Sequence, residues 1–257
     1  MIKILAEAIL NYKLWIAWAW NDILQRYRRS ILGPFWITIS SATVILCLGF
    51  IYSSMLNVPL ENYIPWLGVG LILWYFFSTI LIEGTNLFTE HEGLMKEIRI
   101  NYLIFIFRVL IRNVIILFHN MIIIAGIILY FDIGLNFNIL LFIPGLILCS
   151  LSAFAVIGIC GIICARYRDV SHIITNFTQL LFFITPIIWK PNLIEGRKLL
   201  IVDLNPIFYF LNIVRNPLIN LEVGLISWVV SLIITILLIV IFFIFFYLYR
   251  KKIVFWL

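Results

Sequence analysis

The polar side chains that interrupt the long apolar stretches of this chain are mainly amides and hydroxyls, with aromatic rings near them. Asn176 and Gln179 stand three residues apart, so a helix would place both amides on one face. Amides hydrogen-bond hydroxyl groups, and aromatic rings stack on sugar faces, without a fixed charge that would trap the ligand. This chemistry suits a pathway for a sugar chain. The candidate pathway residues are Trp36, Trp66, Trp74, Tyr75, Asn176, Gln179, Trp189 and Tyr209.

The aromatic members of this set also have an ordinary explanation, because Trp and Tyr form a belt at the membrane–water boundary of many proteins. Catalytic patterns are missing from the sequence. His91, His119 and His172 have no metal-ligand spacing, and the sequence contains neither a Gly-x-Ser-x-Gly elbow nor a Gly-x-x-x-x-Gly-Lys-Ser/Thr phosphate loop. We therefore expect neither an enzyme nor a metal centre.

The acidic residues nearest to the apolar runs, Glu83, Asp132 and Asp169, all lie at the ends of those runs. Carriers driven by protons or sodium usually place ionisable or broken-helix sites near the middle of the membrane. Active transport by this chain would therefore need energy from another subunit.

The composition indicates a polytopic membrane protein. Of the 257 residues, 64% are hydrophobic and only 12% are charged, whereas soluble domains carry about a quarter charged residues. The net charge of +6 comes from cations at the ends of apolar runs, which favours membrane topology over nucleic-acid binding as its explanation. The four cysteines lie inside apolar runs and are expected to be small packing residues.

Six apolar segments are each long enough to cross a hydrocarbon core of roughly 30 Å at about 1.5 Å per helical residue. We expect a single all-α transmembrane domain over residues 1–257, with the fifth segment diluted by polar residues. Of the 18 Lys and Arg residues, 14 fall on the side of the N-terminus, which predicts that both termini are cytoplasmic. The expected spans are 34–54, 64–82, 113–131, 139–163, 171–189 and 225–248.

The segment before the first span is predicted to be an amphipathic helix in the cytoplasmic interface, within residues 1–30. A helix packed on a soluble partner is the alternative. Arg26, Arg28 and Arg29 should stay in the lipid headgroup layer, since arginine is costly inside a bilayer, and Pro34 suits the first turn of the first span. The apolar face of the helix comprises Ile2, Leu5, Ile9, Tyr12, Ile16, Trp20 and Ile23.

The inside connection between the second and third spans contains Glu90, Glu92 and Lys96, and these charged residues predict that it is exposed to water. Thr89 with Glu92 fits a capping box. Arg108 and Arg112 follow one helical turn apart, and we expect them to reach back to the headgroup layer, because the sequence shows no obvious acidic partner for them.

The fourth span repeats small residues at intervals of four, as in Cys149/Ala153 and Gly161/Ala165, which allows helices to approach closely. The pattern leaves open whether this stripe packs inside the subunit or between subunits. The outside connection 190–224 carries three prolines and short apolar runs, so a re-entrant or interfacial hairpin is expected there.

Four stretches together resemble the permease subunit of type-two ABC exporters for polysaccharides, the group that moves O-antigen, capsule or teichoic acid chains. The order and spacing of these stretches agree over almost the whole chain. They are Arg26-Tyr27-Arg28-Arg29-Ser30-Ile31-Leu32-Gly33-Pro34-Phe35-Trp36, Arg166-Tyr167-Arg168-Asp169-Val170, Phe183-Ile184-Thr185-Pro186-Ile187-Ile188-Trp189 and Asn205-Pro206-Ile207-Phe208-Tyr209.

The resemblance implies a homodimer in the bacterial cytoplasmic membrane, joined to two separate ATPase subunits that bind ATP and Mg. It implies that an interface helix over 1–22 and a coupling region over 84–100 receive the ATPase motion, and that an external hairpin over 191–218 gates the outer mouth. The tail after the last span is shorter than such permeases lead one to expect, which puts a tail-mediated contact in doubt. The candidate coupling residues are Arg26, Arg28, Arg29, Glu90, Glu92, Lys96, Arg166, Arg168 and Asp169.

The implied cargo is a glycan on an undecaprenyl diphosphate lipid, which passes between the two protomers among membrane lipids. One alternative keeps the fold and changes the cargo to a drug or another lipid. A second alternative is a polytopic membrane enzyme acting on lipid-linked sugars. The acids and bases of 190–224 (Glu195, Asp203, Arg197 and Arg215) form no recognisable catalytic constellation that would support it.

Overall fold

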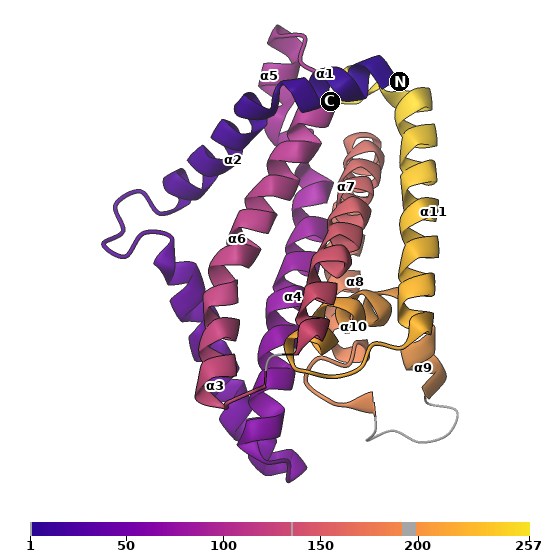
Figure 1. Ribbon diagram of the computed structural model, residues 1–257. Coiled ribbons are helices and arrows are strands. Elements are labelled where there is room, and N and C mark those ends of the chain that lie inside the picture. The colour runs from indigo at the N-terminus through magenta and orange to yellow at the C-terminus, as the bar shows by residue number, and fades with distance from the viewer. Residues whose placement is uncertain (1, 135, 192–198) are drawn as a thin grey trace.

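The computed structural model describes residues 2–134, 136–191 and 199–257, and the regular structure in these ranges is entirely helical, which confirms the all-α expectation. Figure 1 shows both termini at one end of an elongated bundle; we call this the terminal end and the opposite one the far end. The helices are α1 (Ile2–Leu10), α2 (Tyr12–Arg26), α3 (Phe35–Leu56), α4 (Leu60–Asn86), η1 (Thr89–His91), α5 (Glu92–Glu97), α6 (Leu103–Tyr130), η2 (Phe137–Leu141), α7 (Phe142–Arg166), α8 (Val170–Ile184), α9 (Leu199–Asp203), α10 (Pro206–Leu218), α11 (Leu225–Tyr249) and α12 (Ile253–Trp256).

Within the described residues, five helices are long and apolar enough to cross a membrane: α3, α4, α6, α7 with the preceding η2, and α11. The fifth expected span, 171–189, differs from the expectation, because α8 ends at Ile184 after 15 residues. Pro186 explains this end. A proline disfavours helical angles at the residue before it, and Thr185 is accordingly extended at φ −81° and ψ 134°.

The chain that contains α8 nevertheless follows α4 along its length. Near the terminal end, the hydroxyl oxygens of Thr85 on α4 and Ser171 on α8 lie 3.4 Å apart. Near the far end, the Tyr63 hydroxyl on α4 donates a hydrogen bond to the Ile188 carbonyl at 2.7 Å. A sixth passage through the membrane by residues 171–188 therefore stays a prediction, since five of the described helices have the length of a span.

The start of the third span also differs from the expected boundary. α6 begins at Leu103, well before residue 113, and Arg108 and Arg112 lie inside it. Hydropathy places these arginines at the edge of the apolar run. Arginine residues can lie within a helix when acidic side chains neutralise their charge, and the contacts described below provide that neutralisation.

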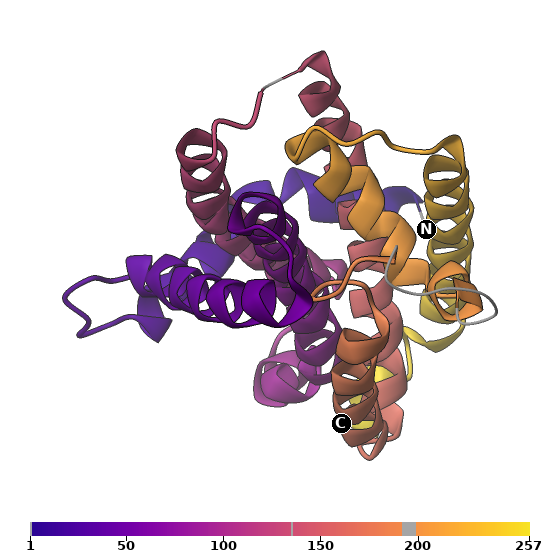
Figure 2. The same ribbon diagram turned by 90° about the horizontal axis from the view of Figure 1, so that it is seen from below.

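The centre of the bundle is α4, which packs against α3, α6, α7 and α8. Figure 2 shows α3 and α11 on opposite sides of this centre, as does Figure 1. The small residues of α7 lie inside the protomer. A Cβ atom on Gly145 would stand 2.7 Å from the Ile213 carbonyl oxygen of α10, and one on Gly158 would overlap the Phe242 ring of α11. The stripe left open by the sequence thus serves packing within the subunit.

The N-terminal segment lies across the terminal end as two helices, α1 and α2, which meet at Asn11 (Figure 1). α2 packs on α6, where the Trp15 ring stacks on Phe107 with centroids 5.3 Å apart and Ala19 is fully buried. The predicted apolar face mostly points away from the protein, since of its described side chains only Ile23 is buried. α2 therefore has two apolar sides, one on the bundle and one directed outward.

Candidate functional site

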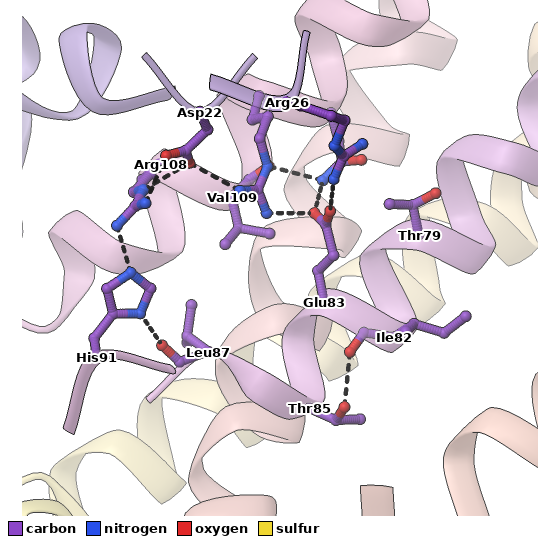
Figure 3. Close-up of polar contacts among 12 residues, drawn as sticks. Asp22, Arg26, Thr79, Ile82, Glu83, Thr85, Leu87, His91, Arg108 and Val109 are labelled. Atoms are coloured by element: carbon purple, nitrogen blue, oxygen red, sulfur yellow. Dashed lines mark hydrogen bonds and ion pairs between the residues drawn. The ribbon is translucent and has the colours of Figure 1, made fainter. Parts of the chain in front are cut away.

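A cluster of five charged residues joins α2, α4 and α6 at the terminal end (Figure 3). Asp22 of α2 accepts hydrogen bonds from Arg108 Nε and Nη2 at 2.8 and 2.6 Å, and from Arg112 Nη1 at 2.8 Å. Arg112 also pairs through Nη2 with Glu83 Oε2 of α4 at 2.7 Å. The side chains of these four residues are only 13–18% exposed. With Arg26, they form what we call the charged cluster.

The edge of the charged cluster carries the remaining contacts of Glu83. Arg26, at the end of α2, approaches Glu83 Oε1 at 3.4 Å, and Asn113 Nδ2 donates to Glu83 Oε2 at 2.6 Å. Three guanidinium groups thus face two carboxylates, which leaves a net charge of +1 in the cluster. This net positive charge lies at the junction between the interface segment and the first span.

His91 extends the network to the turn between α4 and α5. Its Nδ1–H donates to the Leu87 carbonyl at 3.0 Å, so its Nε2 accepts a hydrogen bond from Arg108. Burial, followed by the charge of Arg108, lowers the pKa of His91 below its usual value. The imidazole is therefore neutral near pH 7, and the charged cluster holds the interface helix, two long helices and this turn together.

The expectation that Arg108 and Arg112 extend to the headgroups without an acidic partner is wrong. Their partners, Asp22 and Glu83, stand in other helices, and the Arg108–Asp22 contact spans 86 residues of sequence. A buried ion pair is a weak stabiliser overall, but the loss of one partner is costly because it strands the other charge. This cluster is suited to fixing the position of α2 on α6.

Six of the remaining coupling candidates lie on a second surface, formed by residues 89–97 and 166–169, which we call the turn surface. Glu92 Oε1 pairs with Lys96 at 2.6 Å, and Glu92 Oε2 lies 3.7 Å from Arg168 Nη2. The hydrogen bond from Lys96 lowers the pKa of the Glu92 carboxyl. The structure thus brings together two segments that are separated in sequence by α6 and α7. Glu90 and Asp169 are exposed on this surface, whereas Arg28 and Arg29 are exposed in the loop before α3.

The capping box expected from Thr89 and Glu92 is wrong. The Thr89 hydroxyl donates to the Asn86 carbonyl at 3.2 Å, and the Glu92 carboxylate bonds Lys96 instead of a backbone N–H. Thr89 lies in the short 3₁₀ turn η1 and not at the start of a regular helix. The helix that follows, α5, has only six residues. The connection is a compact turn with a short helix.

The brief C-terminal tail also contributes to the turn surface. The Arg166 guanidinium lies 5.3 Å from the centre of the Trp256 ring, and Arg168 Nη2 donates to the Leu257 carbonyl at 3.5 Å. Ile253 of α12 is fully buried. The tail therefore folds back onto the ends of α5 and α7.

A polar cavity of about 410 Å³ lies between α3, α4 and α6, adjacent to the charged cluster. Two of the candidate pathway residues, Trp36 and Tyr75, line it. Apart from the tyrosines Tyr27 and Tyr75, its hydroxyl and amide groups come from residues that the sequence analysis did not single out for a site. They are Ser40, Ser41, Thr79, Asn113 and Asn120.

The other pathway candidates are distributed over the bundle. Asn176 and Gln179 are exposed on α8. Trp74 is 6% exposed and packs against Phe182. The Trp189 indole donates to the Phe183 carbonyl at 3.1 Å, and the Tyr209 hydroxyl donates to the Asp203 carbonyl at 2.7 Å. One protomer does not gather these residues in one cavity, and a shared pathway stays a prediction.

The far end contains an arginine that the sequence analysis named but did not expect to be buried. Arg215 of α10 is fully buried, and its guanidinium carbon lies 3.3 Å from the centre of the Trp66 ring. It donates to the Pro186 carbonyl at 2.9 Å and to Asn212 Oδ1 at 3.2 Å. Ile213 and Val214 directly precede Arg215 in α10, and their apolar character was the available signal that this segment packs inward.

α10 is the described core of the expected external hairpin, of which residues 192–198 lie outside the described ranges. Pro206 begins the helix, and Asn205 caps it by accepting from the Ile207 N–H at 3.0 Å. The Asn205 amide also donates to the Thr185 hydroxyl at 2.8 Å. These bonds, with those of Arg215, fasten α10 to the segment that follows α8.

Comparison with known proteins identifies the family. Residues 13–219, from the start of α2 to the end of α10, match the model of the ABC-2 type transporter. The chain belongs to this family. It is also 25% identical over 211 residues to the O-antigen export system permease protein RfbA of Myxococcus xanthus, a match that covers 80% of each chain. The protein is thus a multi-pass transporter permease, and the family match encloses the charged cluster and the turn surface. Among the described residues, no group of His, Cys, Asp and Glu has the arrangement of a metal site.

Proposed function

We propose that this chain is the permease subunit of an exporter that moves a lipid-linked polysaccharide across the bacterial cytoplasmic membrane. The observation that carries the proposal is the likeness to an O-antigen export permease over 80% of both chains. The four stretches quoted from the sequence agree with it, and so do the hydroxyls and amides of the polar cavity, which suit sugar hydroxyls.

We further propose that a separate ATPase subunit supplies the energy and binds ATP and Mg. The family is that of an ATP-driven transporter, and the sequence has no phosphate loop of its own. The turn surface would receive the ATPase. It exposes acids and bases together, and behind it the charged cluster ties the turn to α2 and α6. Binding of the ATPase at the turn surface would place the terminal end on the cytoplasmic side of the membrane.

The functional unit in this proposal is a homodimer with two ATPase subunits, and the cargo is a glycan on undecaprenyl diphosphate that passes between protomers. The exposed amides of Asn176 and Gln179 on α8 would line that passage. The export of a drug or another lipid by the same fold is the competing function. A membrane enzyme acting on lipid-linked sugars has less support, because the family match is to a transporter.

The test combines a binding assay with a cellular one. The full chain should co-purify with its ATPase subunit and alter its rate of ATP hydrolysis in lipid, and a deletion strain should retain glycan on the cytoplasmic side. Glu92→Arg should weaken the complex by reversing the charge beside Lys96 and Arg168, whereas Glu222→Arg, exposed at the far end, should not. A deletion strain with normal surface glycan refutes polysaccharide export.

A further inference from the structure

The tail of the chain, residues 250–257, is a folded part of the terminal end. After α11 ends at Tyr249, the chain turns and forms the short helix α12. The Ile253 side chain is fully buried, and the Trp256 ring packs on Tyr249 with ring centroids 5.5 Å apart. α12 contacts both α5 and α7. The tail is thus held at the same end of the bundle as the turn surface (Figure 1).

Two arginines connect the tail with the turn surface. The Arg166 guanidinium lies 5.3 Å from the centre of the Trp256 ring. Arg168 Nη2 donates to the Leu257 carbonyl at 3.5 Å and lies 3.7 Å from Glu92 Oε2. Because these arginines belong to the turn surface and contact the tail, the two form one continuous surface, which we call the composite surface.

The composite surface exposes two aromatic side chains. Phe255 of the tail is 87% exposed, and Tyr167 of the turn surface is 55% exposed. Helical residues are rotated by about 100° from one to the next, so Phe255 lies on the side of α12 opposite to the buried Ile253. Phe255 therefore faces away from the protomer. Single exposed aromatic residues are common, and it is the charges around this pair that indicate a partner.

The charges of the composite surface have both signs. Lys251 and Lys252 of the tail are exposed, and so are Glu90, Glu97 and Asp169 of the turn surface. The cytoplasmic leaflet has a negative surface potential, so it would attract the lysines and repel these acids. A protein can present both signs in matching positions, and an apolar centre within a charged rim is typical of protein–protein interfaces. The composite surface therefore fits a protein partner better than a lipid surface.

The tail lies outside the part of the chain that matches the family. The family model covers residues 13–219, which include the turn surface, whereas the tail occupies residues 250–257. The turn surface therefore belongs to the shared domain, and the tail is an additional element beside it. Specificity is a difference in affinity between competing partners. An element outside the shared domain, placed against the shared surface, is suited to making that difference.

We propose that the tail is a docking element for the ATPase subunit and selects which ATPase this permease binds. Phe255 inserts into an apolar pocket of the ATPase, and Lys251 and Lys252 pair with acids around that pocket. The inference rests on the proposed function, in which the turn surface receives an ATPase. It adds the residues by which this chain prefers one ATPase over another. The shortness of the tail, which put such a contact in doubt, is offset by its position against the turn surface.

The test measures the affinity of the full chain in nanodiscs for two ATPase subunits, the one with which it co-purifies and one from another polysaccharide exporter. The wild-type chain should prefer the first. Phe255→Ser should weaken that binding about tenfold or more, as expected for an aromatic anchor, and should remove the preference. Phe137→Ser is the matched control, because Phe137 is 92% exposed in η2 at the far end. Lys251→Glu with Lys252→Glu should weaken binding at low ionic strength and much less at high ionic strength, because salt screens exposed charges.

A second measurement locates Phe255 in the complex. Phe255→Cys in a Cys47→Ser background offers an exposed thiol for a fluorescent label, since the other three cysteines are buried. Iodide should quench the label in the free chain and should quench it less when the ATPase is bound. A label at Phe137→Cys should be quenched equally in both states. Since Phe255 is exposed, Phe255→Ser should also melt at the wild-type temperature, which separates weaker binding from unfolding.

Three results would overturn the inference. Wild-type affinity of Phe255→Ser for the ATPase would exclude Phe255 as an anchor. Quenching of the label by nitroxide lipids, with no change when the ATPase binds, would make the tail a membrane anchor. Equal affinity of the wild-type chain for both ATPases would remove the role in selection. These failures differ from that of the proposed function: a wild-type chain that binds no ATPase refutes the partnership itself, whereas wild-type binding and export by Phe255→Ser reject only the docking role of the tail.

Discussion

The substitution Asp22→Asn should release α2 from the bundle. The Asp22 carboxylate receives three hydrogen bonds from Arg108 and Arg112, and all three side chains are at most 18% exposed. Removal of one partner from a buried ion pair typically costs about 3–5 kcal/mol. Arg112 keeps its contact with Glu83, so we take the lower value of about 3 kcal/mol.

A cost of about 3 kcal/mol corresponds to roughly a hundredfold rise in the population of undocked α2, at 1.4 kcal/mol for each factor of ten. Hydrogen–deuterium exchange of the amides in Tyr12–Arg26 measures this population directly. Arg28→Gln is the control, because Arg28 is exposed in the loop after α2. Exchange that stays at the wild-type rate in Asp22→Asn, or rises equally in the control, would refute a role for the charged cluster in docking α2.

Three further predictions concern buried groups elsewhere. Arg215→Lys should lower the melting temperature, because it removes the stacking of the guanidinium on Trp66, which is worth about 2 kcal/mol when desolvated. Trp66→Leu should therefore lower the stability less in the Arg215→Lys background than in the wild-type chain. The folded state holds the pKa of His91 below its unfolded value of about 6.5, so the unfolded chain binds more protons as the pH falls below that value. The free energy of unfolding should therefore decline below about pH 6.5. Thermal melts of His91→Gln should show a weaker decline. Gly145→Ala should destabilise the chain by about 1–3 kcal/mol, because the new methyl group meets backbone, whereas Gly126→Ala should be nearly neutral in the same melts.

Hydropathy predicted the approximate positions of most of the long helices, because each long run of apolar residues must be shielded from water whatever it packs against. The boundaries were less accurate where charge and helix overlap. Hydropathy puts Arg108 and Arg112 at the edge of a span, yet both lie inside α6. Hydropathy averages over neighbours in sequence, so it cannot distinguish an arginine that ends a helix from one that is neutralised by another helix.

The charged cluster was beyond sequence reasoning for a related reason. Asp22 and Glu83 each appeared as isolated acids, and nothing in their spacing connects them with the arginines of α6. Their contacts with Arg108 and Arg112 depend on how α2 and α4 lie on α6, which is a property of the tertiary fold. The hydroxyls and amides of the polar cavity were visible as polar residues within spans, but their common location required three helices to be placed.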